Sequence, residues 1–519
     1  MAGGDFFMSF YSILFKTTKR LTQKQALATE APACFVDLNL NQVTDTIISG
    51  KEEYNLQPFF YTSLNDIDDI IYRQQIMQDI ENTILYDYIE SFAKSMREMR
   101  IAQSKAEKCS YKYQKERLFV DCVEVYCKTI QSLANNLSLV NVKSPGFLSF
   151  CEYLNTYIQS GDFTMLLTET KKLVADLSSL QYCVLTKGLR VTVRLCKAET
   201  DYSAEVEHAF EKFKQEAAKD YTTKFSASPE MNHVEASILE GVATLYPAIF
   251  QSLDDYFAKN SNYLDETIAI FDREVQLYIA YLDYTSKIKR AGLKFCYPEI
   301  SNTSKEVFDY EGFDVALAYK LAKENTYIVC NDFYLSGKER IFVVSGPNQG
   351  GKTTFARTFG QLHYLANIGC PVPGKEAKLF MFDKLFTHFE KEENIEDHHS
   401  KLEHDLVRIY HILHESTSNS IIIMNEILSS TTLHDAIFLS KKIMEKITAS
   451  DVLCVWVTFI DELISLSEKT VSIVSTVDAE NPSVRTFEII RRPADGLAYA
   501  LSIAEKYKVT YDYLKERIK

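Results

Sequence analysis

A stripe of apolar residues, spaced alternately four and three positions apart, runs through the middle of the chain between residues 262 and 290. This spacing places the side chains on one face of a helix, and it predicts one long amphipathic helix. A helix that faces a protein core and a helix in a coiled pair both carry such a stripe, and we favour the core-facing helix. The stripe consists of Leu264, Ile268, Phe271, Val275, Tyr278 and Leu282.

Proline positions and alternating residues predict further elements upstream. Pro145 is the only proline between Pro58 and Pro229, so long helices are permitted on either side of it, and residues 64–133 are rich in helix formers. Residues 188–197 alternate apolar and polar positions, which predicts a strand. Residues 203–221 return to a charged helical pattern.

After about residue 296 the pattern changes to short apolar runs separated by stretches of helix length. Buried strands that alternate with helices are typical of an α/β domain. We expect the strands at residues 341–344, 421–424, 452–457 and 471–474.

The first of these runs leads into a glycine-rich loop of the pattern G-x-x-x-x-G-K-[ST], and residues 355–367 can form the helix that follows it. Glycines let backbone N–H groups approach a phosphate, and the start of a helix adds positive potential. We expect Lys352 to meet the β- and γ-phosphates of ATP and the Thr353 hydroxyl to ligate Mg²⁺; a fortuitous glycine turn is the alternative. The expected ATP-binding residues here are Gly346, Pro347, Asn348, Gln349, Gly350, Gly351, Lys352, Thr353 and Thr354.

The second run ends in Asn425 and Glu426. An acid at the end of such a strand, downstream of a phosphate loop, is typical of the group that polarises the attacking water in an ATPase. The alternative is a polar strand end without a chemical role.

These residues carry a resemblance to a known family. The run GPNQGGKTT resembles the GPNMGGKST loop of the MutS family, the mismatch-repair ATPases, and the likeness continues to the end of the chain. SKLEHDL at 400–406 resembles the family's S-T-F-M-x-E-M signature, and NEILSSTTLHDA at 425–436 resembles D-E-I-G-R-G-T-S-T-x-D-G. Residues 495–518 resemble the family's closing helices, and residues 56–81 resemble the start of its helical core.

The resemblance implies an α + α/β fold, with a long-helix core and lever domain followed by an ABC-type P-loop ATPase domain. The implied boundaries are an N-terminal segment at 1–60, the helical domain at 61–294 with a clamp-like insertion at about 185–240, and the ATPase domain at 295–519. It further implies a homodimer in which Ser400 of one chain meets the ATP on the other. Lys352 and Glu426 would be catalytic, Asn331 and Ile328 would lie at the adenine, and Asn425 would hold Mg²⁺ through a water.

The chain departs from the family pattern at several points. Asn425 stands where the family has Asp, and Phe459 replaces the histidine that senses the γ-phosphate. The position of the adenine-stacking aromatic falls at Ile328, next to Tyr327. The N-terminal part is short for the mismatch-reading and connector domains. We therefore expect a slow ATPase that does not read mismatches specifically.

Charge and composition bear on the partners. The 519 residues carry a formal net charge of −14, so any DNA-binding surface has to be local. Residues 91–120 hold eight basic and three acidic side chains, with a solvated helix face as an equal alternative. The candidate DNA contacts in the strand-like stretch are Lys187, Arg190, Arg194 and Lys197.

Other features narrow the setting. Eleven scattered cysteines indicate reduced thiols, and no apolar run is long enough for a membrane span, so we expect a bacterial-type cytoplasm with at most a nucleoid association. His398 and His399 stand beside two acids, which we interpret as a charged loop rather than a metal site.

The leading interpretation is a homodimeric, ATP- and Mg²⁺-binding protein that acts on double-stranded or branched DNA in repair or recombination, independently of sequence. Two alternatives stay open. One is an ABC-type nucleotide switch that regulates a protein partner, which the acidic net charge favours. The other is a non-enzymatic nucleotide-binding scaffold, which Asn425 and Phe459 favour.

Overall fold

The structure is a computed structural model that describes residues 10–16, 27–188, 190–196, 205, 231–390, 401–478, 480–481, 484–493, 504 and 507–518. The chain forms two compact units, and neither is one continuous segment. Unit 1 contains Met1–Phe10, Thr83–Val142 and Phe147–Asp272. Unit 2 contains Tyr11–Asn82, Lys143–Gly146 and Arg273–Lys519.

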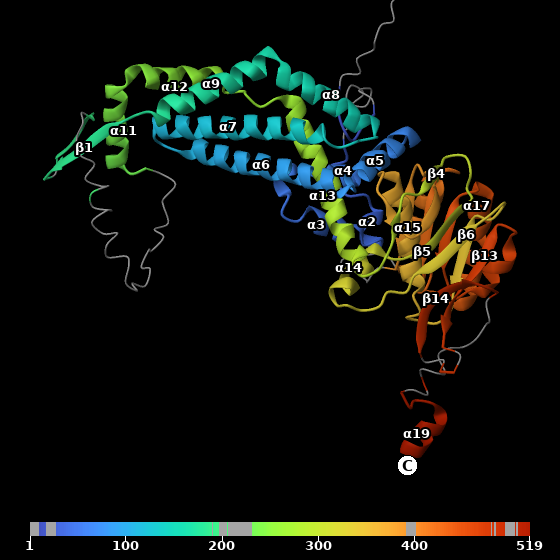
Figure 1. Ribbon diagram of the computed structural model, residues 1–519. Coiled ribbons are helices and arrows are strands. Elements are labelled where there is room, and N and C mark those ends of the chain that lie inside the picture. Colours follow the sequence, from blue (N-terminus) through green and yellow to red (C-terminus); the bar gives the residue numbers. More distant parts are fainter. Residues whose placement is uncertain are drawn as a thin grey trace, which may run out of the picture. The chain divides into compact units, whose positions relative to one another are not determined.

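Unit 1 consists of long helices and one hairpin (Figure 1). Helices α6 (Thr83–Lys108) and α7 (Lys112–Leu137) lie side by side and are joined by residues 109–111. A ring pair from Phe150 and Phe271 stacks in the core of this unit at 3.6 Å between centroids. The other helices described in this unit are α8 (Pro145–Gln159), whose first two residues belong to unit 2, α9 (Gly161–Ser178), α11 (His233–Leu245) and α12 (Pro247–Lys259).

The predicted amphipathic helix is confirmed as α13 (Glu266–Lys289), which is divided between the units after Asp272. Five of the six stripe residues are buried, from Ile268 to Leu282, whereas Leu264 precedes the helix and is half-buried. The stripe therefore faces protein cores, as expected from its spacing.

The predicted strand at 188–197 is confirmed as β2 (Arg190–Leu195), paired antiparallel with β1 (Tyr182–Lys187). The apolar face of β2 is only partly buried, because Val191 and Leu195 stay 40% and 42% exposed. Val193 is close to α11, since a Cβ built on Gly241 would lie 3.1 Å from it. The helix expected at 203–221 lies outside the described residues except for position 205.

Unit 2 contains a six-stranded sheet in the order β10-β11-β12-β7-β13-β14, parallel except for the edge strand β14. The four predicted strands are confirmed in it. Every residue of β7, β11 and β12 is buried, as expected for parallel strands covered on both faces. The strands are β7 (Ile341–Ser345), β10 (Leu385–Phe389), β11 (Ile421–Asn425), β12 (Leu453–Val457), β13 (Thr470–Val477) and β14 (Arg485–Arg491).

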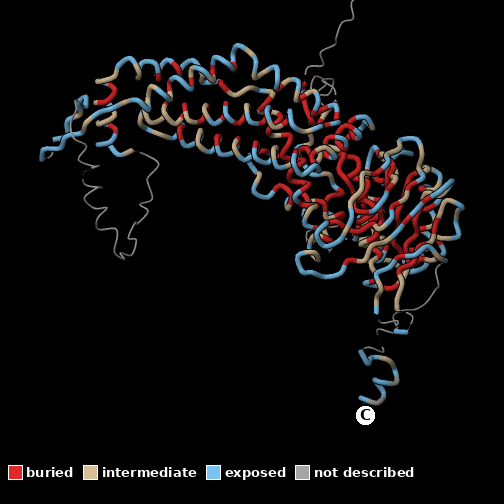
Figure 2. The backbone as a smooth tube through the Cα atoms, in the orientation of Figure 1, coloured by how far each residue is buried: buried red, intermediate tan, exposed pale blue. Residues whose placement is uncertain are grey.

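Helices cover both faces of this sheet, and Figure 2 shows the buried residues concentrated there. On one face, Ile422 and Met424 pack in one apolar cluster with Ile409 of α16 (Lys401–Glu415) and Met444 of α17 (Leu433–Ser450). On the other, α15 (Lys352–Asn367) approaches so closely that a Cβ on Gly360 would lie 2.7 Å from Ile423. The α/β arrangement expected from the apolar runs is therefore present.

Unit 2 also contains a second sheet, a short strand pair and further helices. A second sheet has the order β4-β9-β5-β6, with β4 (Glu299–Ser301), β5 (Val307–Gly312), β6 (Asn331–Leu335) and β9 (Glu376–Phe380). Strands β3 (Phe295–Cys296) and β8 (Val372–Pro373) form a short pair. The helices are α2 (Cys34–Asp37), α3 (Leu40–Ile48), η1 (Glu52–Tyr54), α4 (Gln57–Tyr61), α5 (Ile67–Ile80), α14 (Val315–Lys323), η2 (Asp461–Leu466) and α19 (Tyr511–Arg517). No helix among the described residues is both long and apolar enough to cross a membrane.

Candidate nucleotide site

The glycine-rich loop lies between the buried strand β7 and the start of helix α15. Gly346 has φ of 118°, and a Cβ there would lie 2.8 Å from the Ser475 carbonyl oxygen, so only glycine fits. Gly351 caps α15 with φ of 95°. The Ser475 hydroxyl donates a hydrogen bond to the Gly350 carbonyl at 2.6 Å, which ties the loop to β13. The loop is therefore a fixed turn that presents the first N–H groups of a helix.

Lys352 is buried at the first position of that helix. Its Nζ donates to the carbonyl oxygens of Gly346 and Pro347 at 3.0 Å each and lies 3.7 Å from Glu426 Oε1. The ammonium also lies 4.5 Å from the centre of the Phe459 ring, a cation–π distance. Burial lowers the pKa of Lys352, and the Glu426 carboxylate opposes that shift.

Asn425 and Glu426 reach this site from the end of β11, two strands away from β7. The Thr353 hydroxyl donates a hydrogen bond to Asn425 Oδ1 at 3.0 Å. The Glu426 N–H donates to the Val457 carbonyl at 3.0 Å, and its backbone has φ of 54°. A left-handed conformation is uncommon outside glycine and often marks a functional turn. It leaves Glu426 lining the cavity described next.

A cavity of about 490 Å³ extends from the phosphate loop to the segment before β6. Among the expected site residues it is lined by Ile328, Asn331, Gln349, Gly350, Gly351, Lys352, Thr353, Thr354 and Glu426. Gly346 and Pro347 bind the Lys352 ammonium beside it, and Asn348 Oδ1 lies 3.5 Å from the same atom. Residues 70 to 100 positions apart in the sequence thus meet at one hollow.

Apolar side chains line one part of the cavity, where Phe487 also lies next to the loop, because a Cβ built on Gly351 would be 4.0 Å from the Phe487 Cβ. Ile328 is buried, Tyr327 is 84% exposed, and Phe487 is about half exposed with φ of 61°. Asn331 fixes Phe487 here, because its Nδ2 donates to the Phe487 carbonyl at 3.2 Å and its Oδ1 accepts from the Ile489 N–H at 2.6 Å.

Sequence reasoning missed several lining residues, Phe487 above all. Its strand lies about 140 positions after the loop, and no local motif marks it. The other lining residues without a sequence signal include Phe313, Asp314, Leu317, Leu321, Phe333 and Thr358.

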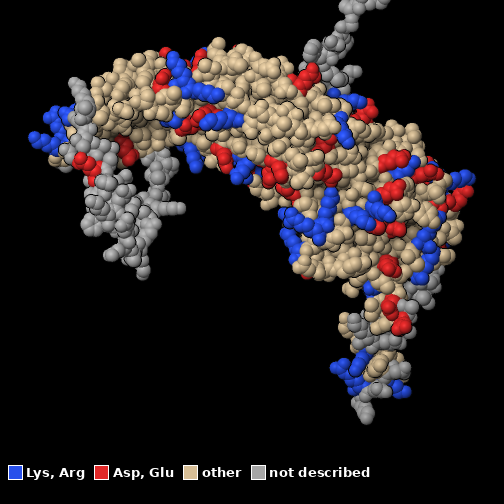
Figure 3. All heavy atoms as spheres, in the orientation of Figure 1, with Lys and Arg blue, Asp and Glu red and all other residues tan. Residues whose placement is uncertain are grey.

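The remaining expected site residues do not line this cavity or are not described. Ser400 and Lys197 lie outside the described residues, as do His398 and His399, which we interpret as part of a charged loop. Lys187, Arg190 and Arg194 lie on the hairpin of unit 1 and are exposed there. Figure 3 shows Lys and Arg side chains gathered over this hairpin, at the end that Figure 1 labels β1.

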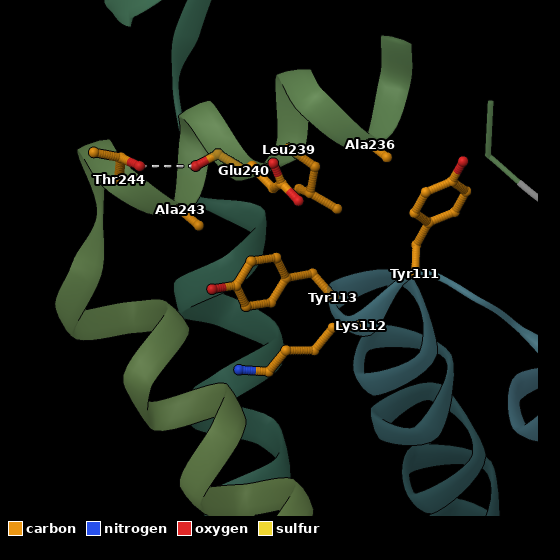
Figure 4. Close-up of a pocket in the computed structure, with 8 residues that line it drawn as sticks. All are labelled: Tyr111, Lys112, Tyr113, Ala236, Leu239, Glu240, Ala243 and Thr244. Atoms are coloured by element: carbon orange, nitrogen blue, oxygen red, sulfur yellow. Dashed lines mark hydrogen bonds between the residues drawn. The ribbon is translucent and has the colours of Figure 1, made fainter. Parts of the chain in front are cut away.

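A second hollow, of about 440 Å³, lies in unit 1 between the start of α7 and helix α11 (Figure 4). Tyr111 and Tyr113 face it from one side, and the Lys112 ammonium is paired with Asp254 at 2.7 Å. None of the expected site residues lines it. The remaining lining residues are Ala236, Leu239, Glu240, Ala243 and Thr244.

The described residues fit ATP with Mg²⁺ at the first cavity. The side-chain oxygens of Thr353 and Asn425 lie 3.0 Å apart, and oxygen atoms are the ligands that hard cations such as Mg²⁺ prefer. The buried Lys352, the residue before Thr353, adds a positive charge for the phosphates. A Cβ on Gly350 would lie 2.1 Å from the Ser475 hydroxyl oxygen, so the loop has no room for a larger residue.

Fold and loop together define a parallel α/β domain with a phosphate-loop motif. Residues 342–514 match the family model for MutS domain V. The C-terminal part of the chain is therefore similar to proteins of the MutS family, through this domain.

Named relatives agree with this similarity. The DNA mismatch repair protein MutS of Orientia tsutsugamushi (strain Boryong) is 30% identical over 217 residues, which cover 41% of this chain and 24% of that protein. The MutS protein of Fervidobacterium nodosum is 27% identical over 299 residues, or 55% of this chain and 34% of that protein. The chain thus spans about a quarter to a third of the length of these relatives.

Proposed function

We propose that this chain binds ATP with Mg²⁺ in the cavity beside Lys352 and hydrolyses it slowly. The observation that carries the proposal is the single cavity that joins the apolar part at Ile328 and Phe487 to Lys352, Thr353 and Glu426. A flat base fits the apolar part, and the triphosphate fits the loop. Mg²⁺, when bound, would neutralise charge on the phosphates.

Within this proposal Glu426 polarises the attacking water, because it is the carboxylate that lines the cavity next to Lys352. Asn425 keeps an acceptor oxygen toward Thr353 but brings no negative charge. Phe459 offers the Lys352 ammonium a ring face and no hydrogen-bond donor to a phosphate. Both features support slow turnover.

Single-turnover hydrolysis tests this assignment. Glu426→Gln keeps the shape of the side chain and removes the base, so phosphate release should fall about 10²- to 10³-fold while ATP still binds. Equal rates for the two proteins would remove Glu426 from the mechanism.

We further propose a homodimer that acts on DNA in repair or recombination, with Ser400 of each chain serving the ATP on the other. The relatives named as DNA mismatch repair proteins support DNA as the partner. The hairpin supports a local surface for contact with DNA. Lys187 pairs with Arg190 across the hairpin, and Arg194 lies four residues after Arg190 on the same strand. Because successive side chains of a strand point to opposite faces, all three share one face of the hairpin. Val193 lies on the other face, toward α11.

A second candidate is a nucleotide switch for a protein partner. It is favoured by the net charge of −14 and by a shallow groove of about 380 Å³ along α16, where Val407 and Tyr410 are 51% and 64% exposed. Gel shifts with branched, mismatched and plain duplexes, with and without ATP, separate the two. Binding to branched or plain duplex supports the first, and no shift with any DNA supports the second.

A further inference from the structure

Asp37 is a buried acid at the end of the short helix α2, far in sequence from the residues that it contacts. Its Oδ2 accepts hydrogen bonds from the Thr387 hydroxyl at 2.7 Å and from Arg408 Nη2 at 3.0 Å. Thr387 lies 350 residues further along the chain. The Asp37 carbonyl oxygen accepts from Arg357 Nε at 3.0 Å. One residue therefore contacts three elements of unit 2.

Each of these elements leads to a part of the proposed ATP site. Arg357 lies on α15, which begins at Lys352. Thr387 lies on β10, whose last residue, Phe389, pairs with Asn425. Arg408 lies on α16, which begins one residue after Ser400 in the sequence.

The junction is tightly built. The side chain of Asp37 is 7% exposed and that of Arg408 is 22% exposed. Arg408 Nη2 also donates to the Thr387 carbonyl at 2.7 Å, and His388 Nε2 lies 3.1 Å from Asp405 Oδ1, so α16 is attached to β10 at two points. Moving Arg408 away from Asp37 would leave a buried charge without its partner, which is costly. The ion pair therefore resists displacement of α16.

We infer that Asp37 is a positioning residue that fixes helix α16 relative to the phosphate-loop helix α15. This inference rests on the proposed function, because it concerns ATP hydrolysis at Lys352 and Glu426. Through Arg357 and Thr387, Asp37 also holds α15, which begins at Lys352, and β10, which pairs with the strand that ends at Asn425. Asp37 thereby positions the groups of the ATP site without touching the nucleotide.

The test uses the full chain and four variants: Asp37→Asn, Arg408→Met, the double variant, and Asp68→Asn as a control. Asp68 forms a surface ion pair with Lys16 and has a 66% exposed side chain. Steady-state hydrolysis gives kcat and KM for ATP, and binding of a fluorescent ATP analogue reports the phosphate-loop site.

We expect Asp37→Asn and Arg408→Met each to lower kcat about tenfold, because a small misplacement of a catalytic group costs this much or more. Binding of the ATP analogue should change by less than about twofold. The double variant should be no worse than either single variant, since both remove the same link. Asp68→Asn should match wild type.

Three results would overturn the inference: an unchanged kcat for Asp37→Asn, losses that multiply in the double variant, or a binding loss equal to the loss of kcat. If Asp37→Asn does not fold, Thr387→Val removes one hydrogen bond only, and an unchanged kcat there is equally contradictory. Wild-type protein that neither binds nor hydrolyses ATP would instead contradict the proposed function itself.

Discussion

At the scale of single residues, the most informative position is Asn425. Its amide oxygen accepts a hydrogen bond from the Thr353 hydroxyl, so it places an oxygen without a negative charge next to Thr353, where we propose that Mg²⁺ binds. Glu426 adopts a left-handed backbone next to it and lines the cavity. In the proposed function the chain thus retains a base but has a weakened ion site, so we expect ATP binding to be robust and hydrolysis to be slow.

Restoring the charge should restore rate. Asn425→Asp adds a carboxylate beside Thr353, and we expect tighter Mg²⁺ binding and a single-turnover rate about tenfold higher. Titration of Mg²⁺ against the rate measures both. The matched control Asn425→Ala, which removes the oxygen, should weaken Mg²⁺ binding. If Asp and Ala leave both quantities at the wild-type values, Asn425 does not take part in holding the ion.

At the scale of elements, the sequence predicted what local pattern encodes. Continuous apolar runs located β7, β11, β12 and β13, and a fixed motif located the loop before α15. Strand order, the partner strand β1 and the contribution of Phe487 depend on interactions between distant segments, and no single stretch encodes them. Val191 and Leu195 show the same limit, because they stay partly exposed. The alternation of apolar and polar residues predicts a strand but does not show whether another element covers its apolar face.

Strand β5 carries a group whose ionisation should affect stability. Asp309 is fully buried between Gly312 and Gly374, and within the described part of the chain neither carboxyl oxygen has a hydrogen-bond partner. Burial, with a smaller contribution from Asp332, raises the pKa of Asp309 to about 9. The folded chain therefore keeps this proton between about pH 4 and pH 9 while the unfolded chain loses it, so stability falls as pH rises through that window.

Asp309→Asn removes this dependence. Relative to the variant, wild type should lose roughly 2 to 4 kcal/mol of unfolding free energy between about pH 5 and pH 8. Urea unfolding at both pH values measures the difference, with the exposed Asp45→Asn as control. Parallel pH dependence in wild type and Asp309→Asn would show that the carboxyl titrates normally.

In the proposed function, DNA binding depends on the hairpin. Its basic face presents Lys187, Arg190 and Arg194, and removing one phosphate-binding side chain should lower the slope of log K against log salt by about 0.9. The variant with Gln at all three positions should therefore bind more weakly at low salt, with a slope smaller by about 3. A variant of two exposed lysines on α9, Lys171 and Lys172, serves as control. An unchanged slope in the triple variant would exclude the hairpin as the phosphate-binding surface.

At the scale of the whole molecule, the two units differ in what they carry. Unit 2 holds the cavity, the Asp37 junction and the MutS domain V match, and unit 1 holds the basic hairpin. Unit 2 also recruits residues from the start of the chain, since Tyr11–Asn82 belongs to it. The proposed ATPase therefore depends on N-terminal residues such as Asp37 as well as on the C-terminal domain.

The nucleotide site is tested most directly by equilibrium binding of ATP with Mg²⁺ to the full chain and to Lys352→Met. We predict saturable binding of one ATP per chain, retained in Glu426→Gln. Lys352→Met should weaken it roughly 10- to 100-fold, because the variant has no ammonium to donate charge-assisted hydrogen bonds to the phosphates. Wild type that binds no ATP, or Lys352→Met that binds it equally well, would contradict the assignment of this cavity as a nucleotide site.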